Sequence, residues 1–183
     1  VADYKMMLAG VLLEVQELTF RYLNVLENEL PDEKTLIEIA EFLSQRLNIF
    51  ISDEFEKYLR NYQIEYLKNR LNRPIRVCGM VRNEGEPGGG PFWIKNESGH
   101  ISLQIVESAQ IDKKNKQQKA ILKKAAYFNP VDLVCGIKDY QGRFFDLQNF
   151  IDHKTSFISE KTKSGKSLKV LELPGLWNGA MSH

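Results

Sequence analysis

The spacing of apolar residues changes at Pro74, and this change constrains the fold more than any other feature of the sequence. Before Pro74, apolar residues recur every three to four positions in three stretches, which is typical of helices that bury one face. After it, short apolar runs alternate with Gly, Asn and Pro, which indicates strands and turns. The sequence therefore predicts an α+β fold, with a helical segment over residues 1–73 and a mixed α/β part over residues 74–183.

The helices are predicted at roughly 3–29, 33–49 and 53–72. Asp32 and Glu33 place negative charge at the start of the second helix, and Asp53 with Glu56 predicts a capping box for the third. The expected buried stripes are Tyr4, Leu8, Val11, Val15, Leu18, Tyr22 and Val25, then Leu36, Ile39, Ala40, Leu43 and Leu47, then Phe55, Leu59, Tyr62, Tyr66 and Leu67. We interpret the aromatic residues as core rather than as a ligand platform.

Beyond Pro74 we expect a mixed sheet that contains residues 75–81, 101–107 and 131–137. Further strand candidates are 92–95, 144–150 and 168–173, with a loop over 161–167. Asp112 is predicted to cap a helix that runs to about Phe128. Six lysines in this stretch form a basic surface, which we interpret as a solvated helix face rather than a phosphate or nucleic-acid site: Lys113, Lys114, Lys116, Lys119, Lys123 and Lys124.

Composition excludes several classes of function. The net charge of +1 gives no global field for nucleic acid or membranes, and the chain has neither a signal peptide nor an apolar run long enough to span a bilayer, so we expect a cytoplasmic protein. Cys78 and Cys135 lie in apolar runs and are expected to be buried, reduced and on strands that can be neighbours. With three histidines and two cysteines, the chain lacks the ligands and spacing of a zinc site, and we predict no metal centre.

The segment GEPGGGPFW is the strongest candidate for a functional feature. Gly88, Gly89 and Gly90 admit close approach to the backbone, and the strand that follows ends at Glu107, an acid that needs a partner if it is buried. One interpretation is a pocket wall that binds a polyhydroxylated ligand; the other is a flexible hairpin loop and an ordinary edge glutamate, which the glycines alone favour. We expect the glycines to lie near Glu107, lining a concavity. The segment is neither a Walker A motif nor a dinucleotide fingerprint.

The order of motifs from Val77 to about Gly136 resembles the UDP-sugar pyrophosphorylases. A strand and charged residues precede the glycines, a second strand reads IVESAQI, a lysine-rich helix follows, and FNPVDL then resembles the family's Phe-Asn-Thr-Asn-Asn-Leu element. The resemblance implies a nucleotidyltransferase-like, Rossmann-like α/β domain that joins a sugar 1-phosphate to a uridylyl group with Mg²⁺. It also implies that Gly89, Gly90, Glu107 and Asn129 surround the sugar, with Asp132 where the family usually has Asn.

The whole chain also resembles the C-terminal part of a longer bacterial family of unknown function, through RVCGMV, GEPGGGPFW and ELPGLWNG. The chain begins at Val1 without Met, and we expect a piece of a longer protein that carries the sugar side of the site and is inactive alone. Mg²⁺ is expected only for a full-length enzyme. The expected partners are a sugar phosphate or nucleotide sugar and the rest of the same chain, without nucleic acid or membrane. The alternative is a non-catalytic carbohydrate- or phosphate-binding module, or a protein-interaction module, on the same scaffold.

Overall fold

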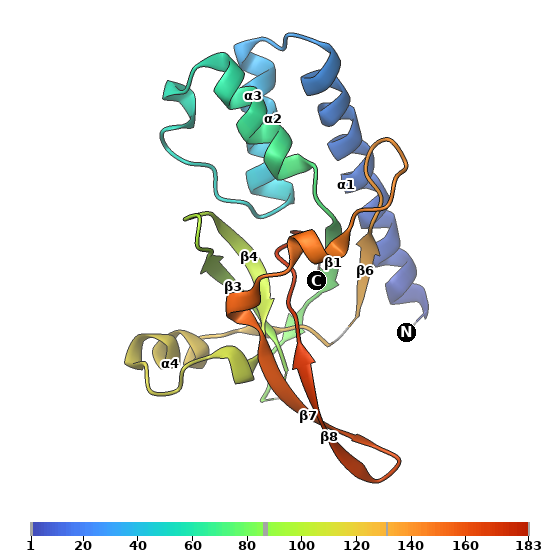
Figure 1. Ribbon diagram of the computed structural model, residues 1–183, viewed down its shortest axis with the longest axis vertical. Helices are drawn as coiled ribbons and strands as arrows, with labels where there is room; N and C mark the ends of the chain where they lie inside the picture. Colours follow the sequence, from blue (N-terminus) through green and yellow to red (C-terminus); the bar gives the residue numbers. More distant parts are fainter. Residues whose placement is uncertain (1, 86–87, 131, 183) are drawn as a thin grey trace.

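The computed structural model describes residues 2–85, 88–130 and 132–182, and of residues 180–182 it describes only the backbone. Pro87, beside the glycine run, and Val131, the first residue of a predicted strand, therefore lie outside the described residues. Figure 1 shows the N-terminal helices above small sheets, with a long hairpin at the opposite end. The helices are α1 (Ala2–Asn28), α2 (Glu33–Arg46), α3 (Arg60–Leu71) and α4 (Lys116–Lys123). The strands are β1 (Ile75–Gly79), β2 (Val81–Arg82), β3 (Gly90–Lys95), β4 (Ile101–Val106), β5 (Tyr127–Phe128), β6 (Leu133–Gly136), β7 (Phe157–Lys163), β8 (Lys166–Glu172) and β9 (Asn178–Ser182).

Helices α1 and α2 confirm the first two predicted helices to within a few residues at each end. Helix α2 begins where predicted because the Asp32 carboxylate accepts a hydrogen bond from the Thr35 backbone N–H at 2.8 Å. The apolar stripe predicted for α2 is buried in full. In the α1 stripe, Leu8, Val15 and Tyr22 are buried, Tyr4 is 68% exposed, and the other members are partly buried.

The predicted third helix is wrong over its first seven residues. A short 3₁₀ turn covers Phe55–Lys57, and α3 begins at Arg60, so Asp53 does not cap it. The chain bends here because Phe55 packs on the ring of Tyr66 at a centroid distance of 5.3 Å. The later start changes which face is buried: the predicted Leu59 and Tyr62 are exposed, and the buried positions of α3 are Gln63, Leu67, Arg70 and Leu71.

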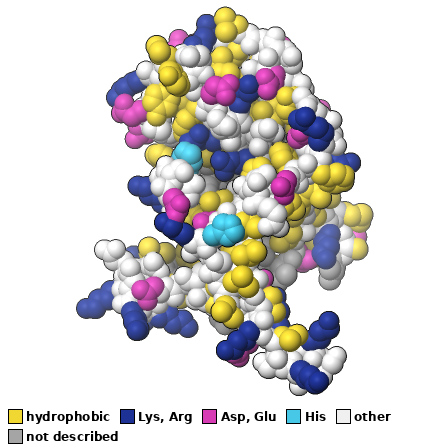
Figure 2. Space-filling view, viewed as in Figure 1, with side chains coloured by type: hydrophobic (Ala, Val, Ile, Leu, Met, Phe, Trp, Pro, Cys, Tyr) yellow, Lys and Arg dark blue, Asp and Glu magenta, His cyan; other side chains and the backbone are white. Residues whose placement is uncertain are grey.

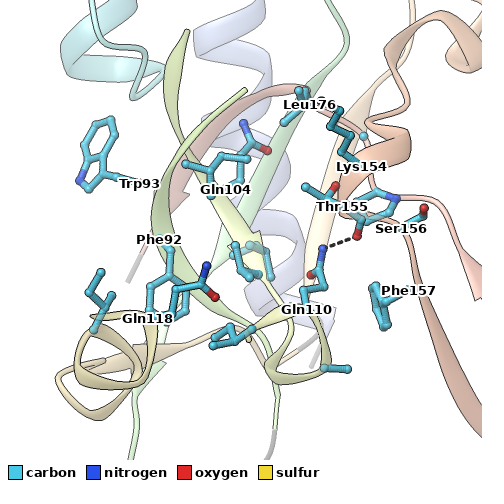
Figure 3. Close-up of a pocket in the computed structure, with 18 of the residues that line it drawn as sticks. Phe92, Trp93, Gln104, Gln110, Gln118, Lys154, Thr155, Ser156, Phe157 and Leu176 are labelled. Carbon is cyan, nitrogen blue, oxygen red and sulfur yellow. Dashed lines mark hydrogen bonds between the residues drawn. The ribbon is translucent and has the colours of Figure 1, made fainter. Parts of the chain in front are cut away.

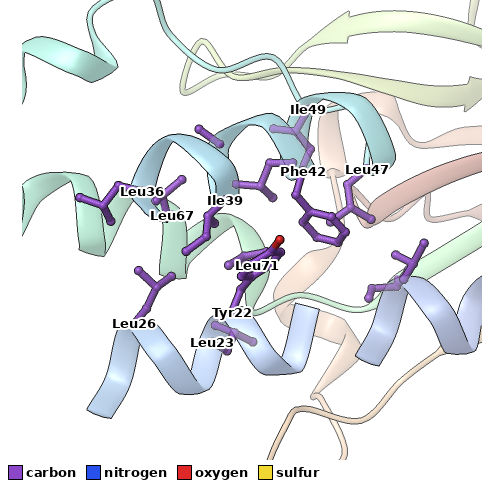
Figure 4. Close-up of a cluster of buried hydrophobic side chains, with 14 of the residues drawn as sticks. Tyr22, Leu23, Leu26, Leu36, Ile39, Phe42, Leu47, Ile49, Leu67 and Leu71 are labelled. Atoms are coloured by element: carbon purple, nitrogen blue, oxygen red, sulfur yellow. The ribbon is translucent and has the colours of Figure 1, made fainter. Parts of the chain in front are cut away.

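The main hydrophobic core lies where the three N-terminal helices meet strand β1 (Figure 4). Leu23 from α1, Leu43 from α2 and Leu67 from α3 are almost fully buried together. Ile75 and Val77 of β1 belong to the same cluster, so one core crosses the change of pattern at Pro74. Burial of each such side chain contributes about 1.5–3 kcal/mol to the free energy of unfolding. The sheet is thereby fixed to the helices.

Strands β6, β1 and β9 form one sheet, in which β1 is antiparallel to β6 and parallel to β9. The expected neighbourhood of the strands around Cys78 and Cys135 is confirmed by this pairing. Residues 101–107 were expected in the same sheet, which is wrong: β4 pairs with β3, and β2–β5 and β7–β8 are separate antiparallel pairs. In the described ranges β1–β9 is the one parallel pair, whereas a Rossmann-like core needs a succession of them. The fold is α+β, and the Rossmann-like expectation is not confirmed.

Three local predictions after residue 110 are also wrong. Residues 144–150 form no strand: Leu147–Phe150 is a 3₁₀ turn that Asp146 caps. The predicted loop at 161–167 is the tip of the β7–β8 hairpin, where Ser164 and Gly165 have positive φ angles that suit a two-residue turn. Helix α4 is shorter than expected because Asn115, not Asp112, caps it.

The two cysteines differ in burial. Cys78 is fully buried on the central strand β1, but Cys135 is exposed, so its predicted burial is wrong. The reason is that β6 is an edge strand, covered on fewer sides than β1. Both thiols are free, and burial raises the pKa of each above its ordinary value. Over the described residues, no helix has the length and apolarity needed to cross a membrane.

Candidate functional site

The structure brings together the residues that the sequence singled out around the glycine run. A side chain at Gly89 would place its Cβ 2.8 Å from a Glu107 carboxylate oxygen, so the predicted proximity of the glycines to Glu107 is confirmed. The Gly89 carbonyl accepts a hydrogen bond from the Asn129 backbone N–H at 2.8 Å. The Asn129 amide donates to the carbonyls of Gly79, at 2.7 Å, and Asp132, at 3.3 Å. We refer to Gly89, Gly90, Glu107, Asn129 and Asp132 as the glycine cluster.

The polar side chains of the glycine cluster also have structural partners. The Glu107 carboxylate accepts from the backbone N–H of Gln110, and the Gln110 side chain accepts from the Glu107 N–H at 2.8 Å, which forms a capping box on a short 3₁₀ turn. The Asp132 carboxylate pairs with Lys5 at 3.6 Å. Asn129 is buried. The cluster thus joins the ends of β1 and β4 to the segment after α4.

A cavity of about 420 Å³ lies beside this cluster, against the β3–β4 hairpin (Figure 3). Its opposite wall is formed by residues 154–157 and 174–176, and α4 contributes Gln118 and Ile121. Gly89, Gly90, Glu107, Asn129 and Asp132 do not line this cavity. Ile105 connects the two places, because it lines the cavity and would contact a Cβ at Gly89 at 2.7 Å.

Two glutamines hold the walls of the cavity together. The Gln110 amide donates to the Thr155 carbonyl at 2.7 Å, the bond drawn in Figure 3. Gln104, which is buried, accepts from Arg76 and donates to the Trp177 carbonyl, both at 3.0 Å. Lys154, on the far wall, pairs with Glu97 of the β3–β4 turn. The cavity is therefore built from segments that are distant in the sequence.

Arg76 is a cation in the wall of this cavity, and the sequence analysis did not single it out. Its guanidinium lies 6.0 Å from the Trp177 ring and donates to Gln104. The Arg76 Nε–H is buried and has no hydrogen-bond acceptor. Among the residues that the structure describes, no carboxylate forms an ion pair with Arg76. The available signal was an arginine inside the otherwise apolar run of β1, a position that normally requires a partner.

Other charged candidates are less enclosed. The six lysines from Lys113 to Lys124 are all exposed, and three of them lie on α4, as expected for a solvated surface. Within the described ranges no group of three His, Cys, Asp or Glu side chains is placed to hold a metal ion. The Mg²⁺ that the pyrophosphorylase resemblance implies for a full-length enzyme stays a prediction.

Comparison with known proteins gives little beyond family membership. A search of the curated proteins found no match. Among solved structures, the chain has weak similarity to a variant of UDP-glucose pyrophosphorylase from Leishmania major in complex with UDP-glucose, with 15% identity and a TM-score of 0.25. The match covers 74% of this chain and 32% of that one, so this chain spans about a third of its length. A protein-family profile matches residues 1–183 in full, and the chain belongs to the family described as "Domain of unknown function (DUF4301)".

Proposed function

We propose that this protein binds a sugar phosphate or nucleotide sugar in the cavity beside Arg76. The observation that carries the proposal is the uncompensated guanidinium of Arg76 on the cavity wall. Arg76 is half-buried, and its buried Nε–H lacks an acceptor, so a bound phosphate would supply both a counter-charge and hydrogen-bond acceptors. The cavity volume of about 420 Å³ lies within the range of small-molecule sites.

The lining suits a ligand that has both apolar and polar surfaces. Phe92 offers an aromatic ring, on which a sugar or a base can pack. Thr155 and Ser156 supply hydroxyl groups on the opposite wall. Such a mixture of aromatic surface and a few placed polar groups is typical of sites for small, partly polar molecules.

The glycine cluster is proposed to bind sugar hydroxyls at the edge of this cavity. The motif order shared with the UDP-sugar pyrophosphorylases supports this role for Gly89, Gly90, Glu107, Asn129 and Asp132. The Glu107 carboxylate has several acceptor positions, and its bond to the Gln110 N–H uses one of them. In this proposal the parent protein is a sugar-1-phosphate nucleotidyltransferase, and this chain carries the sugar side of its site.

Calorimetric titration with glucose 1-phosphate and UDP-glucose tests the binding proposal. We expect Arg76→Gln to weaken binding by about 1.5–3 kcal/mol, because a charge-assisted hydrogen bond is lost. Arg82→Gln is the matched control, since Arg82 is exposed on the adjoining strand β2. Equal affinity of the wild type and Arg76→Gln, or no binding of either probe to a folded wild type, would contradict the proposal.

Glu107→Gln tests the sugar contacts separately, with an expected loss of the same size if the carboxylate accepts sugar hydroxyls. Glu160→Gln, at an exposed position of β7, is a better control than Glu97→Gln, because Glu97 pairs with Lys154 on the cavity wall. Unchanged affinity of Glu107→Gln would remove Glu107 from the site.

A final experiment distinguishes a nucleotidyltransferase from a non-catalytic binding module. It measures whether the full-length protein forms UTP from UDP-glucose and pyrophosphate in the presence of Mg²⁺. Turnover by the wild type that is lower in Arg76→Gln supports a nucleotidyltransferase. Binding without turnover favours the non-catalytic carbohydrate- or phosphate-binding module.

A further inference from the structure

A second, smaller cleft lies between helix α3 and the β3–β4 hairpin, and its charged groups are all basic. Its volume is about 30 Å³, and its lining includes Arg70, Arg73 and His100. In Figure 2, Lys or Arg side chains occupy the hollow beneath the helical part of the molecule, and a histidine lies beside them. Asn96 and Asn178 also line it and contribute amide groups.

Arg70 is the central residue of this cleft. Its side chain is 7% exposed, although it carries a positive charge. One terminal nitrogen donates to the Tyr66 carbonyl at 3.2 Å, and the guanidinium lies 3.3 Å from the centre of the Tyr66 ring. The Arg70 Nε–H is buried and has no acceptor. The aromatic ring attracts the cation, but it leaves this N–H unsatisfied and the charge without an anion.

The neighbours of Arg70 add positive charge. Arg73 donates to the Asn69 carbonyl at 3.0 Å, and within the described residues neither arginine forms an ion pair with a carboxylate. Lys68, on the same helix, shows the contrast, because it pairs with both Glu27 and Glu65. Burial lowers the pKa of both arginines, and an arginine nonetheless remains charged at neutral pH. The positive charges of Arg70 and Arg73 repel each other, and an anion bound in the cleft would offset this repulsion.

We propose that Arg70, Arg73 and His100 form a binding site for a small oxyanion of the phosphate class, separate from the cavity beside Arg76. The cleft has room for about two water-sized groups, so oxygen atoms of a phosphoryl group can enter it and a sugar ring cannot. Gln104 and Leu176 line both spaces and stand between them. The inference does not depend on the function proposed for the larger cavity.

Titration of the intact protein with inorganic phosphate, followed by NMR of the His100 imidazole, tests the proposal. Phosphate is expected to shift the His100 signals with saturation and to raise the His100 pKa, because a bound anion stabilises the imidazolium. Arg73→Gln is expected to weaken the binding by about tenfold, the loss of one charge-assisted contact. Arg60→Gln, at the exposed start of the same helix, is expected to bind as the wild type does.

Methyl phosphate separates the two sources of the anion. Saturation by inorganic phosphate supports a free anion, and saturation by methyl phosphate alone supports a phosphoryl group of a larger ligand. The proposal would be overturned if neither inorganic phosphate nor methyl phosphate shifted the His100 signals. It would also be overturned if Arg73→Gln bound phosphate with the affinity of the wild type. Arg76→Gln distinguishes this site from the larger cavity, because the phosphate response of His100 is expected to survive in that variant.

Arg70→Met gives a second readout that does not rely on histidine. Removal of a buried cation that lacks a carboxylate partner is expected to leave the apoprotein folded. Phosphate should raise the Tm of the wild type and of Arg60→Gln but not that of Arg70→Met. An equal rise in all three would overturn the role of Arg70.

Discussion

Arg76 on β1 and Gln104 on β4 are joined across two separate sheets by a hydrogen bond of 3.0 Å. The same glutamine donates to the Trp177 carbonyl, just before β9. One side chain thus connects the β1 sheet, the β3–β4 hairpin and the C-terminal segment. Because Gln104 is buried, water cannot take over its hydrogen bonds to Arg76 and Trp177 if the side chain is removed.

Gln104→Leu is expected to lower the free energy of unfolding by about 2–4 kcal/mol, because it leaves polar groups of Arg76 and Trp177 unpaired. Gln148→Leu, at an exposed position, is expected to change it by less than about 0.5 kcal/mol. Urea unfolding of both variants measures the difference. Similar midpoints for the two would show that Gln104 does not hold the sheets together.

Gly89→Ala is expected to destabilise the protein by about 1–3 kcal/mol, as overpacking usually does. The new methyl group would lie 2.7 Å from Ile105 and 2.8 Å from the Glu107 carboxylate. Gly10→Ala is the control: nothing lies within 4 Å of its Cβ position in helix α1, and alanine there should stabilise by about 0.5–1 kcal/mol. Thermal unfolding of the pair should give shifts of opposite sign, and a stable Gly89→Ala would refute close packing against Glu107.

The two thiols are expected to differ in reactivity. Burial raises both pKa values, so both thiols are protonated at neutral pH, but only Cys135 is exposed to a reagent. Labelling of native Cys78→Ser should be faster than that of native Cys135→Ser by at least about tenfold. In urea the rates should converge. Equal rates in the native state would contradict the burial of Cys78.

His100 is expected to titrate below the ordinary histidine pKa of 6.5. Desolvation lowers its pKa, and the charges of Arg70 and then Arg73 lower it further. Because the folded pKa lies below the unfolded one, His100 favours the folded state above about pH 6.5, and this contribution is lost as the pH falls from there towards the folded pKa. NMR titration in phosphate-free buffer should show a higher His100 pKa in Arg70→Met than in the wild type. If the His100 pKa were the same in Arg70→Met and the wild type, the charge of Arg70 would not act on His100.

Local patterns in the sequence determined much of the N-terminal half. The spacing of Leu36, Ile39 and Leu43 predicts the buried face of α2, because a helix repeats every 3.6 residues whatever it packs against. Asp32 predicts its start, since capping is a contact within one turn. The proximity of Gly89 to Glu107 also followed from motif order.

Tertiary structure alone decided the start of α3, the exposure of Cys135 and which basic residues share a cleft. Leu59 and Tyr62 fit a helical stripe, yet they are exposed because the packing of Phe55 on Tyr66 delays the start of α3. Cys135 lies in an apolar run, but its strand is at the edge of a sheet, and strand order is a long-range property. Arg70, Arg73 and His100 line one cleft, although α3 and the β3–β4 hairpin are distant in the sequence and no local pattern codes for this arrangement. Periodicity specifies which face of an element is apolar, whereas side chains from distant segments converge only when the whole chain packs.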